Sequence, residues 1–462
     1  MHLVANRLAG SVIAVGLALS AFTSSPAVAQ EGDAAGEVLF IRAGKVVVRP
    51  GEVIENAQVI VEDGVIRDVG TNLTKPDGAR EIEGAVVCAS FIDPWSTLGL
   101  SSDAARDAST NAATRSTDGL DPYTSAELRT DVLRSGVTVV RTQAGARAKL
   151  QGVGAVVRVA PGLDADDAVV LSDASIGASV GVTISRTADP FDRLSDVDRL
   201  VGLVESGRKY REDHVEYKYK LEEWQKEIAE KEAELEKDFK KAKKDRDKKK
   251  AKADEEGDEF KDKKYKEDKR PKAPKVDEAK ASMARVADGE LPLVVHVHRA
   301  AELRGLLSAT KPFDRLRLVV AGGTEALSAA KELAARHIPV IVWPAPLGSS
   351  NADEFTGHDL SLAGRLAAEG VTVLIGSGGQ AGATRDLPLL VGLAIGHGLD
   401  RDDAFAALTT RAARVLDVSD RLGAVESGKD ADLLVLDGEP LVSTTRVRYV
   451  VTAGRVAVSP EE

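Results

Sequence analysis

From residue 136 onward the chain repeats one unit, a short and continuously apolar run followed by an amphipathic segment. The apolar runs span residues 136–142, 291–298, 316–323, 338–344 and 371–379. Amphipathic helices are predicted at 324–336, 360–369 and 401–415 from their hydrophobic periodicity. Continuous apolar runs are typical of parallel strands that are covered on both faces. The alternation therefore restricts this part of the chain to a (β/α) barrel or a doubly wound sheet.

The two ends of the chain have a different pattern, with short alternating apolar runs that are separated by turn residues. Near the N-terminus, strands are predicted at 37–48, 58–70 and 80–87, and Glu62-Asp63-Gly64 supplies a hairpin turn within the second run. Near the C-terminus, strands are predicted at 431–436 and 447–458. Because the two sets are alike in length and turn chemistry, we expect them to pair in one small β unit.

Residues 205–290 interrupt the barrel pattern with a highly charged segment. Leu221, Ile228, Leu235 and Ala242 recur at intervals of seven, and Tyr217 and Trp224 occupy the companion position. This spacing predicts a long solvated helix with a narrow apolar seam, as in a coiled coil, which leaves self-association open. The lysine-rich run 240–252 is interpreted as a solvated linker rather than a docking site for an anionic surface, and 253–275 as disordered chain or a frayed helix end.

The first 29 residues resemble a secretory signal peptide. Arg7 precedes an apolar run over 8–22, and Ala27-Val28-Ala29 provides a small-residue cleavage site before Gln30. We therefore expect an exported protein, periplasmic or secreted, and no other apolar run is long enough to span a membrane. The net charge of −11 argues against a nucleic-acid partner. The only cysteine, Cys88, ends an apolar run and is expected to be a buried, inert thiol.

Four segments together resemble the amidohydrolase superfamily, in particular its imidazolonepropionase-like branch. They are L-G-A-V-E-S-G-K-D-A-D-L-L-V-L-D-G-E-P-L at 422–441, L-T-T-R-A-A-R-V-L-D-V at 408–418, E-D-G-V-I-R-D-V-G at 62–70 and F-I-D at 91–93. The resemblance implies a distorted TIM (β/α)8 barrel with a small β-sandwich built from both chain ends and a long charged helical insertion. The expected divisions are a signal peptide at 1–29, sandwich at 30–88, barrel at 89–204, insertion at 205–290, barrel at 291–421 and sandwich at 422–462.

The resemblance also implies a catalytic metal, usually zinc, that activates water to hydrolyse carbon–nitrogen bonds in cyclic amides. Most of the family's ligand positions hold other residues in this chain. Trp95 and Thr97 replace the two histidines after the first barrel strand, Gly322 replaces the histidine of the sixth strand and Gly378 the aspartate of the eighth. His296 on the fifth strand matches a family ligand, and His298 follows on the same side of that strand. No motif locates the ligand of the fourth strand, although Asp173 is one carboxylate in that region.

Two functions follow from this ligand count. The first is an amidohydrolase-like protein that has lost metal-dependent hydrolysis, has no cofactor, and binds a small molecule or a protein partner, in the manner of a pseudoenzyme or scaffold. The alternative is a carbon–nitrogen hydrolase with an atypical site that is metal-free or holds zinc through His296 and His298. Its catalytic candidates are His296, Asp93 and Glu325. Hydroxyl groups at the barrel mouth would come from Ser96, Thr97, Thr142 and Ser377, with Arg299 as an anion clamp.

Overall fold

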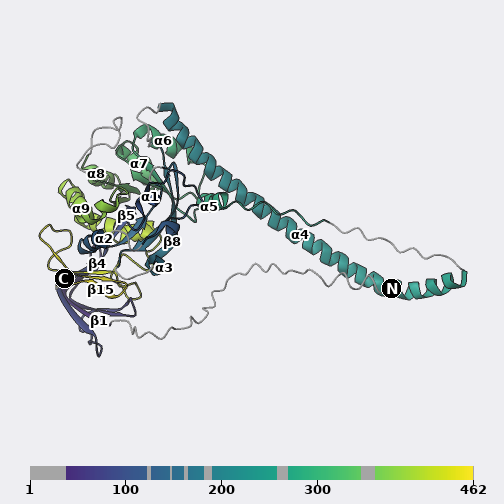
Figure 1. Cartoon of the computed structure of the whole chain (residues 1–462), viewed down its shortest axis with the longest axis horizontal. Helices are drawn as coiled ribbons and strands as arrows, with labels where there is room; N and C mark the ends of the chain where they lie inside the picture. The colour runs from purple at the N-terminus through teal and green to yellow at the C-terminus, as the bar shows by residue number, and fades with distance from the viewer. Residues whose placement is uncertain are drawn as a thin grey trace. The chain divides into compact units, whose positions relative to one another are not determined.

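The computed structural model describes residues 38–121, 126–145, 148–160, 165–181, 190–256, 269–344 and 359–460, without the side chains of 165, 190–194 and 232–256. Its larger sheet curls into a nearly closed barrel, which confirms the expected distorted TIM barrel (Figure 1). In chain order its strands are β5 (Phe91–Ser96), β6 (Val137–Thr142), β7 (Leu150–Arg158), β8 (Val169–Ser179), β9 (Leu293–Val297), β10 (Leu318–Gly322), β11 (Val340–Val342) and β12 (Val373–Ile375). The amide of Gly379 donates to the carbonyl oxygen of Trp95 at 3.0 Å, which joins the last strand to the first.

The barrel departs from a regular (β/α)8 pattern at β7, which runs antiparallel to both of its neighbours, β6 and β8. The remaining neighbours in the sheet are parallel. Only residues 143–149 separate β6 from β7. A parallel strand would need a crossover of a dozen or more residues, so this short connection can only return the chain antiparallel. Neither β7 nor β8 was predicted from the apolar pattern.

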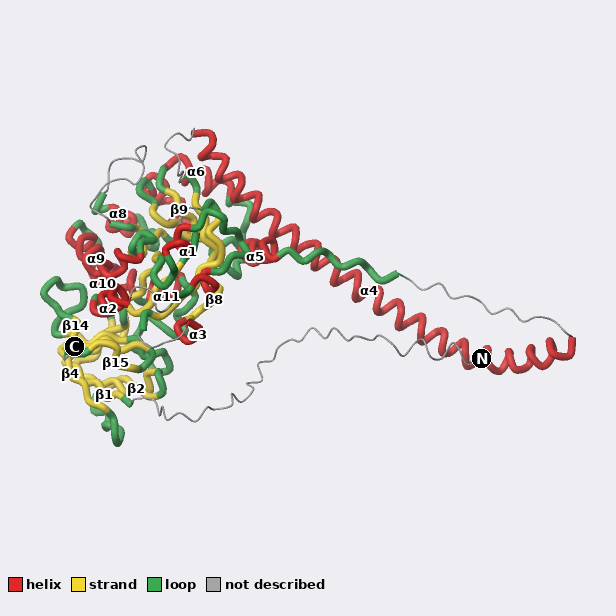
Figure 2. Tube along the Cα trace, viewed as in Figure 1, coloured by secondary structure: helices red, strands yellow, loops and turns green. Residues whose placement is uncertain are grey.

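Helices and 3-10 turns lie around the barrel (Figure 2), and α11 (Thr410–Val415) packs against its inward-facing side chains. Those of the first half are α1 (Ser102–Arg106), η1 (Ser116–Gly119), α2 (Ala126–Arg134) and α3 (Ala165–Ala168). Those after β9 are α6 (Ala300–Ala309), η2 (Ala326–Ala329), α7 (Ala330–Ala335), α8 (Leu362–Ala368), η3 (Ala381–Asp386), α9 (Leu387–Gly396), α10 (Arg401–Leu408) and α11 (Thr410–Val415). The single helix predicted at 401–415 is therefore two helices. The break falls at Thr409, which leaves helical geometry at φ −125° and ψ −102°.

The smaller sheet joins both ends of the chain, as expected. Its order is β15-β14-β13-β4-β1-β2-β3. The N-terminal strands are β1 (Leu39–Arg49), β2 (Glu52–Glu62), β3 (Val65–Gly70) and β4 (Arg80–Ala89), and the C-terminal ones are β13 (Leu433–Leu436), β14 (Val447–Thr452) and β15 (Arg455–Val458). β13 pairs with β4 through apolar residues, with Leu434 opposite Cys88. Cys88 is fully buried there, and burial raises the pKa of its thiol, so the thiol is inert.

A buried ion-pair network links this sheet to the barrel. Arg158, at the end of β7, is only 7% exposed, and its guanidinium contacts the carboxylates of Asp430 and Asp432. Two nitrogens of Arg158 lie 3.0 and 3.1 Å from Oδ2 of Asp432. The hydroxyl group of Thr452 on β14 donates to the same carboxylate at 2.9 Å. The two aspartates of the K-D-A-D segment thus compensate a buried charge that the barrel supplies.

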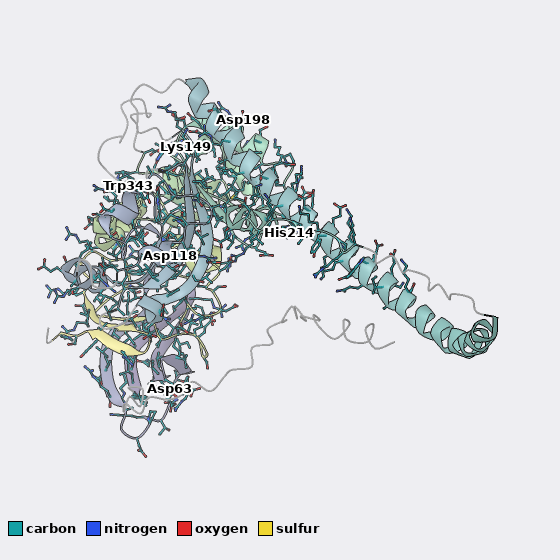
Figure 3. The ribbon with its side chains drawn as sticks, turned by 45° about the vertical axis from the view of Figure 1, so that its right-hand side comes forward. Asp63, Asp118, Lys149, Asp198, His214 and Trp343 are labelled. Carbon is teal, nitrogen blue, oxygen red and sulfur yellow. The ribbon has the colours of Figure 1, made fainter. Side chains whose placement is uncertain are left out.

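The charged segment forms one helix, α4 (Pro190–Glu256), which begins earlier than the expected boundary at 205. Val197, Leu200 and Val204 of α4 are buried in the main hydrophobic core. Lys149, labelled in Figure 3 near Asp198 of α4, reaches the buried carboxylate of Asp196 at 2.6 Å. Farther along, α4 packs on α5 (Glu278–Ala287).

The predicted apolar seam coincides with the half-buried positions of α4. Tyr217, Leu221, Trp224 and Ile228 are half-buried, whereas the residues between them are exposed. Side chains beyond residue 231 of α4, most of the segment predicted to fray at 253–275, and the expected signal peptide at 1–29 all lie outside what is described. No helix in the described ranges is both long and apolar enough to cross a membrane.

Candidate functional site

The expected site lies where β5, β9, β10 and β12 end. On β5, Asp93 is fully buried. Its Oδ1 accepts hydrogen bonds from the backbone amides of Trp95 at 3.0 Å and Ser377 at 3.1 Å. Its Oδ2 accepts from the hydroxyl group of Thr384 at 3.1 Å. Burial raises the pKa of Asp93 to about 6, although these donors oppose the shift. The carboxylate thus fastens the end of β12 to that of β5.

Hydroxyl groups surround Asp93 in the same buried pocket. Ser96 and Thr384 share a hydrogen bond of 2.7 Å, and the hydroxyl group of Ser377 donates to the carbonyl oxygen of Trp95 at 2.8 Å. Thr97 donates to the carbonyl oxygen of Gly379 at 3.2 Å. The candidate hydroxyl groups at 96, 97 and 377 are therefore engaged in closing the barrel. Thr384, which completes this set from η3, was not identified from the sequence.

His296 on β9 and His298 directly after it point to the same side, as the strand alternation predicted, and contact each other directly. Their Nε2 atoms are 2.7 Å apart, and Nδ1 of His298 lies 2.6 Å from the hydroxyl oxygen of Thr324. In the hydrogen bond between the two Nε2 atoms, one imidazole donates its N–H and the other accepts with its lone pair. The Nε2 lone pairs of the two rings therefore cannot both be free. Burial, and then the neighbouring His298, hold the pKa of His296 well below its ordinary value.

The histidine pair does not have the spacing of two zinc ligands. Nitrogens bound to one tetrahedral zinc at about 2.0–2.1 Å stand about 3.3 Å apart. The observed 2.7 Å is the distance of a hydrogen bond instead. In the part of the chain that the structure describes, no group of three or more His, Cys, Asp or Glu side chains could hold a metal ion. The donor set of the described residues therefore does not fit the family's metal.

Two tryptophan rings lie beside positions that the resemblance assigns to metal ligands. Trp95, 9% exposed, meets the His296 ring edge-on with 4.8 Å between ring centroids. A Cβ atom added at Gly379 would stand 2.8 Å from Nε1 of Trp95. Trp343, which follows β11 and is labelled in Figure 3, lies against Gly378, where an added Cβ would stand 2.5 Å from the ring. Trp343 was not identified from the sequence, although a tryptophan directly after an apolar strand was a visible signal.

The glycines at these positions are required by the backbone as well as by the neighbouring rings. Gly322 has φ +88° and Gly378 has φ +74°, in the left-handed region that other residues rarely adopt. A Cβ at Gly322 would stand 2.7 Å from Cε1 of His298. A metal-ligating side chain at either position would therefore meet both a strained backbone and an occupied space.

The remaining candidate carboxylates have structural partners. Oε2 of Glu325 accepts a hydrogen bond of 2.7 Å from the amide of Ala300, the first residue of α6, and so caps that helix. Asp173 forms ion pairs with Arg115 and with Arg285, the latter at 2.5 Å. Arg299 lies 3.7 Å from the carboxylate of Glu302 in the first turn of α6.

One charged group in the barrel wall was not identified from the sequence. Arg141 on β6 is 1% exposed, and its guanidinium donates to the hydroxyl group of Ser175 at 2.6 Å and to Oε1 of Gln143 at 2.5 Å. Burial lowers its pKa to about 10, so it remains a cation at neutral pH. A lone arginine within the apolar run V-T-V-V-R-T was the signal that could have identified it.

Comparisons with known proteins agree with this architecture. Residues 371–458 match the amidohydrolase family. An amidohydrolase from Thermotoga maritima MSB8 superposes with a TM-score of 0.70 at 21% sequence identity, covering 91% of this chain and all of that one. A second amidohydrolase gives a TM-score of 0.52 at 15% identity over 92% of this chain and 100% of its own. A Xaa-Pro dipeptidase with methionine bound in its active site gives 0.51 at 14% identity over 91% and 99%. No curated protein matches the sequence.

These findings confirm the expected fold and agree with the resemblance inferred from the sequence. The chain has the amidohydrolase fold, and its C-terminal residues 371–458 carry the sequence of the amidohydrolase family. Its place in the imidazolonepropionase-like branch stays a prediction.

Proposed function

We propose that this chain is an exported amidohydrolase-like protein that has lost metal-dependent hydrolysis and acts by binding a small molecule or a protein partner. One observation carries the proposal. The rings of Trp343 and of the histidine pair stand where side chains at Gly378 and Gly322 would have to be. Ligand loss is thus accompanied by repacking, and a single substitution would not restore the metal site.

The use of the carboxylates supports the same function. Metal-activated hydrolysis needs a carboxylate that can take a proton from the bound water. Asp93 accepts three hydrogen bonds with no exposed surface, and Glu325 caps α6. Each is thus engaged in holding the fold, which supports a function that does not use these carboxylates for proton transfer.

The alternative is a carbon–nitrogen hydrolase that works without the family's metal set. The chain of contacts from His296 to His298 to Thr324 favours it, since a base aligned with a hydroxyl group is the arrangement of a nucleophilic enzyme. In that function His298 would accept the proton of Thr324, and His296 would orient His298. Zinc would enter only if the two imidazoles separated.

Metal content and hydrolysis distinguish the two functions. We expect protein purified without chelator to contain substoichiometric zinc, and hydantoin and dihydrouracil to be hydrolysed no faster with added zinc than without it. The variants His296→Ala and, as a surface control, His397→Ala should give the same results as the parent chain. One equivalent of tightly held zinc that is lost in His296→Ala would refute the proposal. Metal-free hydrolysis lost only in His296→Ala would establish the alternative.

Export is a separate part of the proposal and rests on the N-terminal sequence. We expect cleavage between Ala29 and Gln30, so that the mature protein begins at Gln30. N-terminal sequencing of protein from the periplasmic and extracellular fractions measures this directly. Recovery of the chain only from the cytoplasm, with residues 1–29 still attached, would contradict it.

A further inference from the structure

A cavity of about 650 Å³ lies at the junction of the barrel and the smaller sheet. The barrel contributes α2, η3 and α9 to its wall, and the sheet contributes β13, β14 and β15. Of these elements, α2, α9 and β15 are labelled near the C-terminus in Figure 1. The volume is typical of pockets that hold small ligands, and junctions between structural units are a frequent place for them. None of the candidate site residues discussed above lines this cavity.

Positive charge is concentrated in this cavity although the whole chain has a net charge of −11. Four arginines, Arg134, Arg385, Arg446 and Arg448, line it together with one acid, Asp386. Arg385 is paired with Asp131 at 3.3 Å and lies 3.9 Å from Asp386. Among the described residues, the side chains of the other three arginines have no hydrogen bond or ion pair. Three guanidinium groups are therefore available to an anion.

The rest of the wall is apolar. Leu389 on α9 is 64% exposed, one of few large apolar side chains in the described part of the chain that face solvent to this extent. Leu441, Val447, Phe91 and the prolines at 388 and 460 also line the cavity. Exposed apolar surface that adjoins a concave charged wall is a feature of ligand sites, because contact with an apolar group removes both surfaces from water.

We propose that this junction cavity binds a small amphiphilic anion, in which an acidic head group is attached to an apolar body. The head group, a carboxylate or a phosphate, contacts Arg134, Arg446 and Arg448, and the apolar body lies along Leu389 and its neighbours. A purely anionic ligand would leave the apolar side chains of the cavity unexplained, and a purely apolar ligand would leave its arginines unexplained. The site is separate from the barrel mouth, so it does not depend on the loss of hydrolysis proposed above.

Calorimetric titration of the full chain with four probes tests this inference. Sodium octanoate and octyl phosphate carry both parts of the ligand, 1-octanol lacks the charge, and inorganic phosphate lacks the apolar body. We expect saturable binding of octanoate, of octyl phosphate or of both, at least about tenfold tighter than that of 1-octanol or inorganic phosphate. Binding of the anions should weaken as the salt concentration rises, because exposed charge pairs are screened.

Two variants and one matched control locate the site. Arg134→Gln combined with Arg448→Gln should weaken anion binding at least about tenfold, and Leu389→Gln should weaken it while leaving inorganic phosphate unaffected. Arg455→Gln changes an exposed arginine of β15 that does not line the cavity, and should bind like the parent chain. All substituted side chains are exposed, and thermal unfolding checks that each variant is folded. The proposal fails if neither anion binds saturably, or if the double variant and Arg455→Gln bind them equally well.

Discussion

Replacing Gly378 by alanine tests directly whether the Trp343 ring fills the position that the resemblance assigns to a ligand. Two costs are expected. The residue has φ +74°, and an L-residue in the left-handed region costs about 1–2 kcal/mol. The new methyl group would stand 2.5–2.8 Å from three atoms of the Trp343 ring, and overpacking of this kind costs about 1–3 kcal/mol. Together these effects predict that Gly378→Ala lowers the free energy of unfolding by about 2–5 kcal/mol.

The two contributions can be separated with matched variants in urea unfolding followed by circular dichroism. Gly428 has φ +87° with no atom within 4 Å of an added Cβ, so Gly428→Ala measures the backbone cost alone. Trp343→Ala removes the ring, so in that background Gly378→Ala should cost no more than Gly428→Ala does. The double-mutant cycle should therefore give a coupling of about 1–3 kcal/mol between positions 343 and 378.

The reasoning is refuted if Gly378→Ala costs no more than Gly428→Ala in the parent chain, or if its cost is unchanged when Trp343 is removed. Either result would mean that the ring does not occupy the ligand position. In that case a carboxylate could be reinstated there by substitution alone, and the proposed loss of the metal site would not be fixed by packing.

Two further predictions concern buried charge. Arg158→Gln should lower the free energy of unfolding by about 3–5 kcal/mol, because it leaves the buried carboxylate of Asp432 without its cation and leaves Asp430 with Arg421 alone. The exposed control Arg455→Gln should change it by less than about 0.5 kcal/mol, and equal effects of the two substitutions in urea unfolding would contradict this. Asp93 has a folded-state pKa of about 6, above the unfolded value of 3.8, so its contribution to stability is fully present below pH 3.8 and is lost as the pH rises through 6. At about 1.4 kcal/mol per pKa unit the loss is about 3 kcal/mol. The variant Asp93→Asn lacks this titration. Its free energy of unfolding relative to the parent chain should therefore rise by up to about 3 kcal/mol between pH 4 and pH 7. If the stabilities of the two chains change with pH in parallel, the pKa of Asp93 is ordinary.

Local sequence patterns were sufficient to predict those strands and helices whose hydrophobic pattern is complete within a few neighbouring residues. Apolar runs placed β6, β9, β10, β11 and β12, and the turn at Glu62-Asp63-Gly64 separates β2 from β3 as expected. The pairing of the two chain ends followed from their similar lengths and turns. These features are encoded by neighbouring residues, because hydrophobic periodicity and turn chemistry act over a few positions.

The direction of β7 and the partners of the site residues were decided only by the tertiary structure. Asp93 receives its hydrogen bonds from Ser377 and Thr384, nearly the whole length of the barrel away in the chain. Glu325, expected near the mouth as a catalytic candidate, instead caps a helix that precedes it. The sequence showed that position 378 has no side chain that could bind a metal, but it did not show that Trp343 lies against this position. Closure of the barrel creates these contacts between strands that are distant in sequence. A local sequence pattern therefore cannot predict which side chains will be in contact.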